Sequence, residues 1–228
     1  MKQIWKQTWR HRLAAALIQL LMVLAMAGVG IRMPVQAAEK NAVTQSGEMK
    51  VHFLDVGQGL SILAQSEGKT MIYDGGDRKT SRFVVSYLKE HGVSKIDYLI
   101  SSHYDADHMA GLIGCLNAFD VKNVISSNYV HTSKLYQSFV KAVKTDGLKM
   151  QHPAVGKTYK FGRGSFEILA PKTIEAKGSN NNSVAIKLMN GENSFVFTGD
   201  AEHESEAAMC NSSICLLYTS PSPRDPKT

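Results

Sequence analysis

The stretch Ser102-His103-Tyr104-Asp105-Ala106-Asp107-His108 places two histidines and two aspartates within six residues. It follows an apolar run, Asp97-Tyr98-Leu99-Ile100, after one further serine, and precedes Met109-Ala110-Gly111. An apolar strand that ends in a polar loop is where α/β proteins usually place their functional sites. Imidazole and carboxylate groups together supply the mixed nitrogen and oxygen ligands that suit zinc, manganese or iron. The stretch therefore predicts a metal site.

The spacing within this stretch suggests how its side chains converge. In an extended loop His103, Asp105 and Asp107 alternate, so they project to one side. His108 follows where the loop turns into a helix, so it approaches the same point from another direction. The alternative is a solvated polar loop without a ligand, and the density of ligand types argues against it.

These residues resemble the H-x-H-x-D-H motif of the metallo-β-lactamase superfamily, with Asp105 in place of the second histidine. The H-x-D-x-D-H form, together with Phe53-Leu54-Asp55-Val56-Gly57-Gln58-Gly59, resembles one branch of that family. This branch comprises the metallo-hydrolase domain of ComEC-type DNA-uptake proteins and its free-standing secreted relatives. The resemblance covers roughly residues 49–209. It implies a four-layer αββα sandwich, two sheets faced by helices, with metals at one edge.

The pattern of short elements is compatible with that fold, and by itself it predicts an α+β or layered α/β domain. Helical spacing of apolar residues predicts helices over 79–91, 109–119 and 134–144, with another helix beginning at 201–209. β-rich runs bounded by turn residues predict strands at 50–55, 61–65, 70–73, 96–100, 123–125, 158–161, 165–169, 184–189 and 194–198.

Length and charge limit the class of protein. The 228 residues suffice for one domain and a terminal extension. The formal charge of +6 arises mainly from residues 1–38, which hold five basic and no acidic residues. The remainder has 21 basic against 20 acidic residues, so the overall charge is poor evidence for nucleic-acid binding. Three cysteines give no disulfide framework, although a Cys210–Cys215 bridge stays open.

Residues 1–38 are typical of an export signal. A basic segment runs to Arg12, an apolar stretch follows, and Val35-Gln36-Ala37 offers the small residues of a cleavage site. The alternative is an uncleaved membrane anchor, because about 17 apolar residues lie near the lower limit for spanning. Either way this segment engages the membrane or the export machinery, and the domain acts outside the cytoplasm. Residues 39–48 are a polar linker.

The last residues, 210–228, differ from the domain predicted over 49–209. Three prolines fall within the last eight residues, and Leu216–Asp225 has neither helical nor strand periodicity. The sequence of this segment resembles translated sequencing-adapter read-through, and a disordered tail is the alternative. The family's last metal ligand comes from a His-His-Gly-Ser-like run, which has no match after Asp200. We therefore expect a truncated domain with its second half incomplete, unstable and at most weakly active.

Four further residues lie in patterns that match the family. The run Phe197-Thr198-Gly199-Asp200 ends an apolar strand in a carboxylate, which in the family bridges the two metals. A turn with Asp200 as helix N-cap is the alternative. Asp74 precedes two glycines and is expected to shape the loop under the site. Asn182 and Ser183 belong to an Asn-rich run that either contacts substrate or ligands or is an ordinary polar loop.

The predicted function is an exported metal-dependent hydrolase acting on phosphodiesters, DNA among them. The metal ligands would be His103, Asp105, Asp107, His108 and Asp200, holding two divalent ions, zinc or manganese. Asp107 would also orient or deprotonate the attacking water. Two alternatives stay open: hydrolysis of a small ester, lactam or phosphorylated metabolite, and a non-catalytic domain that binds metal or a partner. Leu60, where the family usually has an acidic residue, favours the last. No feature of the sequence indicates a protein partner.

Overall fold

The computed structural model describes residues 47–175 and 180–211. The predicted export signal (1–38), most of the linker and nearly all of the tail (210–228) lie outside the described residues. Among the residues that the structure describes, every helix is too short or too polar to span a lipid bilayer.

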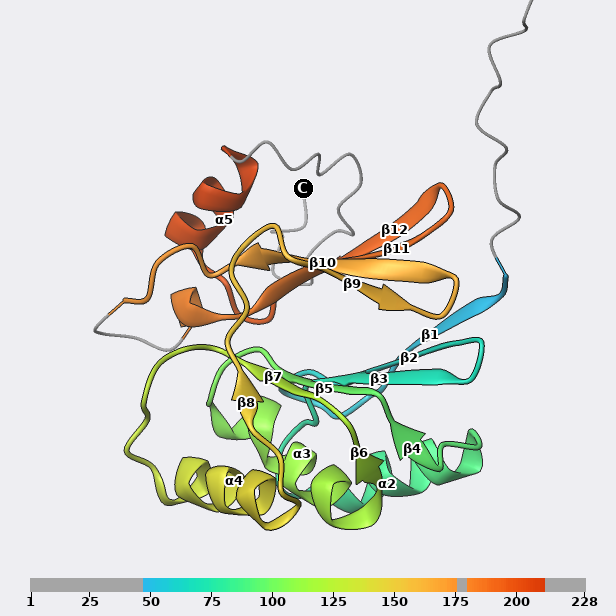
Figure 1. Ribbon diagram of the computed structural model, residues 1–228. Helices are drawn as coiled ribbons and strands as arrows, with labels where there is room; N and C mark the ends of the chain where they lie inside the picture. Colours follow the sequence, from blue (N-terminus) through green and yellow to red (C-terminus); the bar gives the residue numbers. More distant parts are fainter. Residues whose placement is uncertain (1–46, 176–179, 212–228) are drawn as a thin grey trace, which may run out of the picture. The chain divides into compact units, whose positions relative to one another are not determined.

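Six strands form the first sheet, in the order β1-β2-β3-β5-β7-β8 (Figure 1). Strands β1, β2 and β3 are antiparallel, and β2 and β3 are joined by a two-residue turn in which Glu67 and Gly68 both have positive φ. From β3 onward the pairing is parallel. The bounds are β1 (Met49–Phe53), β2 (Ile62–Ser66), β3 (Lys69–Tyr73), β5 (Tyr98–Ser101), β7 (Val124–Ser126) and β8 (Met150–Gln151).

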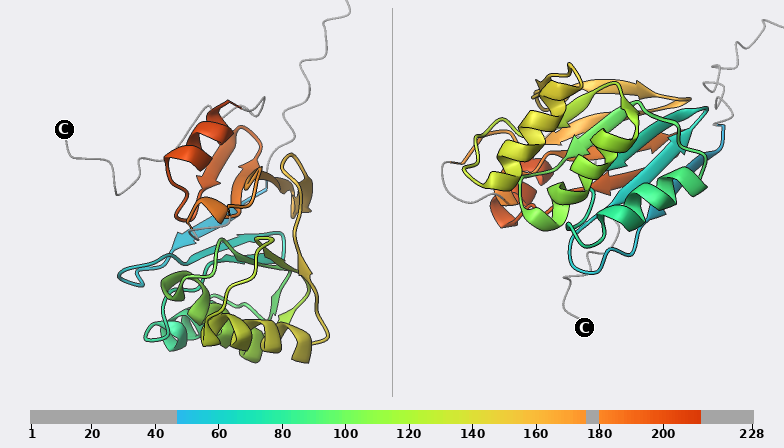
Figure 2. Two further views of the ribbon diagram at one scale, coloured as in Figure 1. Left: turned by 90° about the vertical axis from the view of Figure 1, so that its left-hand side faces the viewer. Right: turned by 90° about the horizontal axis from the view of Figure 1, so that it is seen from below.

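Parallel strands need crossover connections, and three helices provide them. They are α2 (Ser81–Glu90), α3 (Ala106–Ala118) and α4 (Lys134–Thr145), and all three cover one face of the first sheet (Figure 2). The helices contribute side chains such as Leu88, Leu112 and Phe139 to a core that includes Leu63 and Leu99 of the sheet. A short parallel pair, β4 (Lys95–Ile96) with β6 (Asp120–Val121), extends this layer.

The second sheet is antiparallel, in the order β12-β11-β10-β9. Its bounds are β9 (Thr158–Phe161), β10 (Gly164–Ala170), β11 (Ala185–Asn190) and β12 (Asn193–Phe197). A second apolar core lies between the two sheets, where Tyr73 and Ile100 meet Phe166, Ile186 and Phe197. The chain between β10 and β11 contains a short 3-10 helix, η1 (Asn180–Asn182).

Helix α5 (His203–Cys210) covers the outer face of the second sheet, where Met209 packs with Leu169, Ala170 and Ala185. The described chain is thus layered helix, sheet, sheet, helix, as the family resemblance implies (Figure 1). The predicted α+β class is corrected to α/β with mixed sheets. The first sheet joins an antiparallel part, β1-β2-β3, to parallel strands connected by helices, and only the second sheet is wholly antiparallel. The predicted incompleteness of the second half stays a prediction.

Two local predictions are wrong. The expected strand 96–100 is two strands, because the backbone N–H of Asp97 donates to Thr70 while its carboxylate accepts from Lys69 and from the Thr70 N–H. The expected helix 109–119 begins earlier, at Ala106, with Asp105 as an extended N-cap residue. Asp107 therefore lies on a helix and does not alternate with His103 and Asp105 along a loop.

Candidate metal centre

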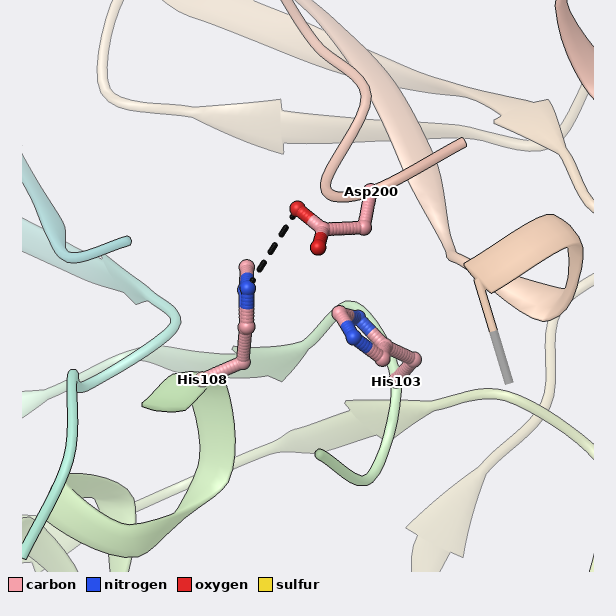
Figure 3. Close-up of side chains that lie close together, drawn as sticks. All are labelled: His103, His108 and Asp200. Carbon is pink, nitrogen blue, oxygen red and sulfur yellow. Dashed lines mark ion pairs between the residues drawn. The ribbon is translucent and has the colours of Figure 1, made fainter. Parts of the chain in front are cut away.

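Three of the predicted ligands meet at one edge of the inter-sheet layer (Figure 3). His103 follows the end of β5, His108 lies in the first turn of α3, and Asp200 follows β12 after Gly199. One ligand atom of each lies within 4.8 Å of the others. The two imidazole rings are tilted at a centroid distance of 4.3 Å. A strand end, a helix start and the second sheet thus contribute one group each.

Glycines allow the start of α3 to lie close to two other loops. The Gly75 N–H donates to the His108 carbonyl at 2.7 Å, and the Gly111 N–H donates to the Gly76 carbonyl at 3.0 Å. A Cβ on Gly111 would lie 1.8 Å from the Gly75 oxygen, and one on Gly59 would lie 2.1 Å from the Asp107 oxygen. Glycines in the 55–59 and 74–76 runs are thus required, because a side chain there would push these loops away from the start of α3, which carries His108.

His103 is fully buried, and its two ring nitrogens have different surroundings. Nδ1 lies 2.8 Å from the Ser102 hydroxyl and 3.4 Å from that of Ser183. Nε2 is buried and has no hydrogen-bond partner among residues 47–175 and 180–211. An Asp105 carboxylate oxygen lies 3.6 Å from Nε2, which is too far for a hydrogen bond. A buried nitrogen in this state is costly unless something binds it.

His108 is held from both sides by carboxylates. Its Nδ1 donates to Asp74 at 2.9 Å, and its Nε2 lies 3.3 Å from Asp200 and 4.0 Å from Asp107. Burial disfavours the charged imidazole, but the hydrogen bonds and negative charges of Asp200 and Asp74 outweigh it and raise the pKa of His108 to about 10. The same negative surroundings favour a divalent cation in competition with that proton.

Asp74 lies behind the histidines and is fully buried. Its carboxylate accepts from the Ser102 N–H at 2.7 Å, the Ser102 hydroxyl at 2.6 Å and His108 Nδ1. Its φ of +56° is unusual for a residue with a side chain, and the two following glycines continue the sharp turn. Asp74 therefore supports the imidazoles from inside the protein and does not face a substrate.

The other predicted residues lie around this group. The side chains of Asp105 and Asp107 are 43% and 29% exposed, at the rim. Ser183 is buried, and its hydroxyl accepts from the Asp200 N–H at 3.3 Å. The amide of Asn182 is bonded to the backbone of Glu175 at both ends, which indicates a loop-forming role.

The donor set fits a divalent metal. Two imidazole nitrogens and a carboxylate oxygen are a zinc-type set, and ligand atoms of one tetrahedral zinc lie about 3.3 Å apart. The observed spread is wider and requires only a small inward movement. The unpartnered His103 Nε2 is the observation that a bound cation would explain. Asp105 and Asp107 provide further oxygen atoms near the same point.

Ser102 is the residue for which the sequence prediction assigned no role. Its hydroxyl lies between Asp74 and His103, and its carbonyl accepts from the Val184 N–H of the second sheet at 2.8 Å. The only signal in the sequence is its position directly before the first histidine.

The layered fold and this histidine-carboxylate group define a class of protein. The family described as "Metallo-beta-lactamase superfamily" matches residues 54–225, and the chain belongs to this superfamily. A metallo-beta-lactamase from Cronobacter sakazakii has a TM-score of 0.48 and 13% identity, covering 65% of this chain and 58% of its own.

Within the superfamily the chain is distantly homologous to competence proteins. It is 30% identical over 162 residues to Recombination protein 2 of Haemophilus influenzae, covering 69% of this chain and 19% of the relative. It is 25% identical over 185 residues to ComE operon protein 3 of Bacillus subtilis, covering 73% of this chain and 24% of the relative. The chain thus spans about a fifth to a quarter of the length of these relatives.

Proposed function

We propose that the chain is an exported metal-dependent hydrolase that cleaves phosphodiesters. The observation that carries this proposal is the buried, unpartnered His103 Nε2 beside His108 and Asp200. His103, His108 and Asp200 would hold a divalent ion, and Asp105 and Asp107 would complete sites for two ions. The extra carboxylate oxygens favour manganese, and the imidazoles keep zinc in competition.

Bound divalent metal lowers the pKa of a coordinated water and neutralises phosphate oxygens. The chain's own residues have distinct tasks around it. Asp74 and Ser183 orient His108 and Asp200. Asp107 is partly exposed beside His108, so it can accept a proton from the attacking water. His103 and His108 are buried, so the fold holds their nitrogen donors in place before an ion binds.

The relation to proteins named for competence and recombination supports DNA as the phosphodiester. One observation favours a smaller substrate: residues 39–228 carry 21 basic against 20 acidic residues, so they have no strong electrostatic attraction for nucleic acid. Hydrolysis of a small ester, lactam or phosphorylated metabolite is therefore the second candidate. A non-catalytic metal-binding domain is the outcome if metal binds and no substrate is turned over.

A substrate panel tests the proposal. Purified full-length protein would be loaded with manganese or zinc and assayed on single-stranded DNA, bis(p-nitrophenyl) phosphate, p-nitrophenyl acetate and nitrocefin. We expect metal-stimulated cleavage of the first two, a loss of at least 100-fold in Asp107→Ala/His108→Ala, and parent activity in His131→Ala. Ester or lactam turnover alone would select the second candidate.

Export is the second part of the proposal and rests on the composition of residues 1–38. Cleavage after Ala37 would leave a mature chain that begins at Ala38. N-terminal sequencing of protein recovered outside the cell tests this directly. A chain that retains Met1 and fractionates with membranes would support the anchor instead.

A further inference from the structure

One buried hydroxyl connects the two imidazoles of the candidate metal centre. The Ser102 oxygen lies 2.6 Å from the Asp74 carboxylate and 2.8 Å from His103 Nδ1. The same Asp74 oxygen, Oδ2, lies 2.9 Å from His108 Nδ1. Ser102, Asp74 and His103 are fully buried, and His108 is nearly so. The four groups therefore form one continuous chain of hydrogen bonds from ring to ring.

We propose that Ser102 is a positioning residue that fixes the tautomer of His103, so that one buried carboxylate orients both imidazoles for metal binding. Asp74 acts on His108 directly and on His103 through the Ser102 hydroxyl. In His103 the proton lies on Nδ1 and the lone pair on Nε2, and in His108 the Nδ1 proton is donated to Asp74. The metal part of this inference rests on the proposed function, and the tautomer part does not.

Proton accounting supports the direction of each hydrogen bond. An ionised carboxylate only accepts, so the 2.6 Å contact requires the Ser102 hydroxyl proton to lie toward Asp74. The Ser102 oxygen then offers only lone pairs to His103, so the 2.8 Å contact requires a proton on His103 Nδ1. A neutral imidazole has one ring proton, so Nε2 is left as an acceptor. This agrees with the unpartnered state of Nε2.

The serine is held in this position by the second sheet. A Cβ on Gly199 would lie 2.6 Å from the Ser102 Cβ and 2.9 Å from its hydroxyl oxygen. Only a glycine at 199 therefore lets the Asp200 loop close over Ser102. The loop that carries Asp200 therefore also restricts the Ser102 hydroxyl, which sets the tautomer of His103. The contact between Gly199 and Ser102 thus couples closure of the Asp200 loop to the tautomer of His103.

Ser183 is the competing partner for His103, and its geometry is weaker. Its hydroxyl lies 3.4 Å from Nδ1, against 2.8 Å for Ser102. It also accepts from the Asp200 N–H at 3.3 Å. A hydrogen bond weakens steeply over this range, so Ser183 is a secondary acceptor. Ser183→Ala should therefore disturb the Asp200 loop more than the His103 tautomer.

The chain offers a matched control in the preceding residue. Ser101 is equally buried, and its hydroxyl donates to the His103 backbone carbonyl at 2.7 Å, without a recorded contact to a ring nitrogen. Ser102→Ala and Ser101→Ala each remove one buried hydroxyl of the same size at the end of β5. A purely structural role predicts similar effects for both. A tautomer role predicts an effect on His103 for Ser102→Ala alone.

The experiment is nitrogen NMR of the imidazoles in metal-free full-length protein, followed by zinc titration with a chelator competitor. We expect the parent and Ser101→Ala to show His103 protonated on Nδ1, and Ser102→Ala to show both tautomers. Zinc affinity should fall about 10- to 100-fold in Ser102→Ala and less than about 3-fold in Ser101→Ala.

Two outcomes would overturn the inference: a parent His103 protonated on Nε2, or a Ser102→Ala variant with the parent tautomer and zinc affinity. The parent spectrum gives this answer even if Ser102→Ala fails to fold. A parent that binds no zinc would refute the metal function, while its His103 tautomer would still decide the role of Ser102.

Discussion

The imidazoles and the carboxylates of the candidate centre are held in different ways. His103 and His108 are buried in the first sheet's layer and bonded through Nδ1 to the Ser102–Asp74 pair. Asp200, Asp107 and Asp105 lie at the solvent edge, with side chains 22%, 29% and 43% exposed. The nitrogen donors are thus oriented as part of folding, whereas the oxygen donors can adjust to the ion. Substitutions in the two sets should separate stability from metal affinity.

The largest effect is expected at Asp74. Asp74→Asn removes the charge that accepts from Ser102 and His108, so buried donors are left without a good partner. Breaking a buried charged network of this kind costs about 3–5 kcal/mol. Urea denaturation of the metal-free protein measures it. In the control variant Asp107→Asn, at the partly exposed rim and 4.0 Å from His108 Nε2, stability should change by less than about 1 kcal/mol. Equal losses in both variants would contradict the comparison.

A smaller effect is expected where α3 meets the Gly75 loop. Alanine at position 111 would bring a Cβ to 1.8 Å from a backbone oxygen, so Gly111→Ala should destabilise by about 1–3 kcal/mol despite its better helix propensity. Gly114→Ala is the control on the same helix, because its nearest neighbour is the Ser81 hydroxyl, which can rotate away. Thermal unfolding should rank them in that order. A stabilised Gly111→Ala variant would show that the helix start is not tightly docked.

Asp97 provides a reference carboxylate on the same sheet, before β5 instead of after it. Burial opposes its charged form, but hydrogen bonds from Lys69 and the Thr70 N–H outweigh this and lower its pKa. A lowered folded-state pKa stabilises the protein above the unfolded value of about 3.9, and the benefit is lost as pH falls through the folded value. Asp97→Asn should therefore cost about 1–2 kcal/mol at pH 7 and less near pH 2.5. An equal cost at both pH values, by urea denaturation, would refute this.

The strands and helices were largely predictable because they depend on local patterns. Alternation and helical spacing located the longer elements within one to three residues, but the short elements β6, β8 and η1 were not predicted. The break at Asp97 was not predictable, since it depends on hydrogen bonds to β3, nearly thirty residues earlier. The early start of α3 was not predicted, because the residues of its first turn belong to the polar ligand motif and were interpreted as a loop.

The site was predictable in part for a similar reason. His103 and His108 are close in sequence, so their spacing alone indicates a shared site. Asp200 lies almost a hundred residues later and was assigned through the family resemblance. The roles of Asp74 and Ser102 depend on contacts between separate strand ends, which no local pattern encodes.

The smallest change in stability is expected at Asp105. This exposed residue lies 3.6 Å from His103 Nε2, so Asp105→Asn should alter stability by less than about 0.5 kcal/mol. The substitution should change metal selectivity instead, because loss of a carboxylate ligand lowers the affinity for a hard ion more than for a softer one. Competitive titrations should show a larger loss of affinity for manganese than for zinc. An unchanged ratio of the two affinities would place Asp105 outside the metal site.

The most direct test of the account is the metal content and zinc affinity of the full-length protein. It should be compared with His103→Ala, His108→Ala, Asp200→Asn and the control His131→Ala, which lies outside the site. Equilibrium dialysis followed by elemental analysis gives both quantities. We predict at least one tightly held ion per chain in the parent and in His131→Ala, and its loss from the three site variants. Equal metal content in all five proteins would contradict the assignment of His103, His108 and Asp200 as ligands.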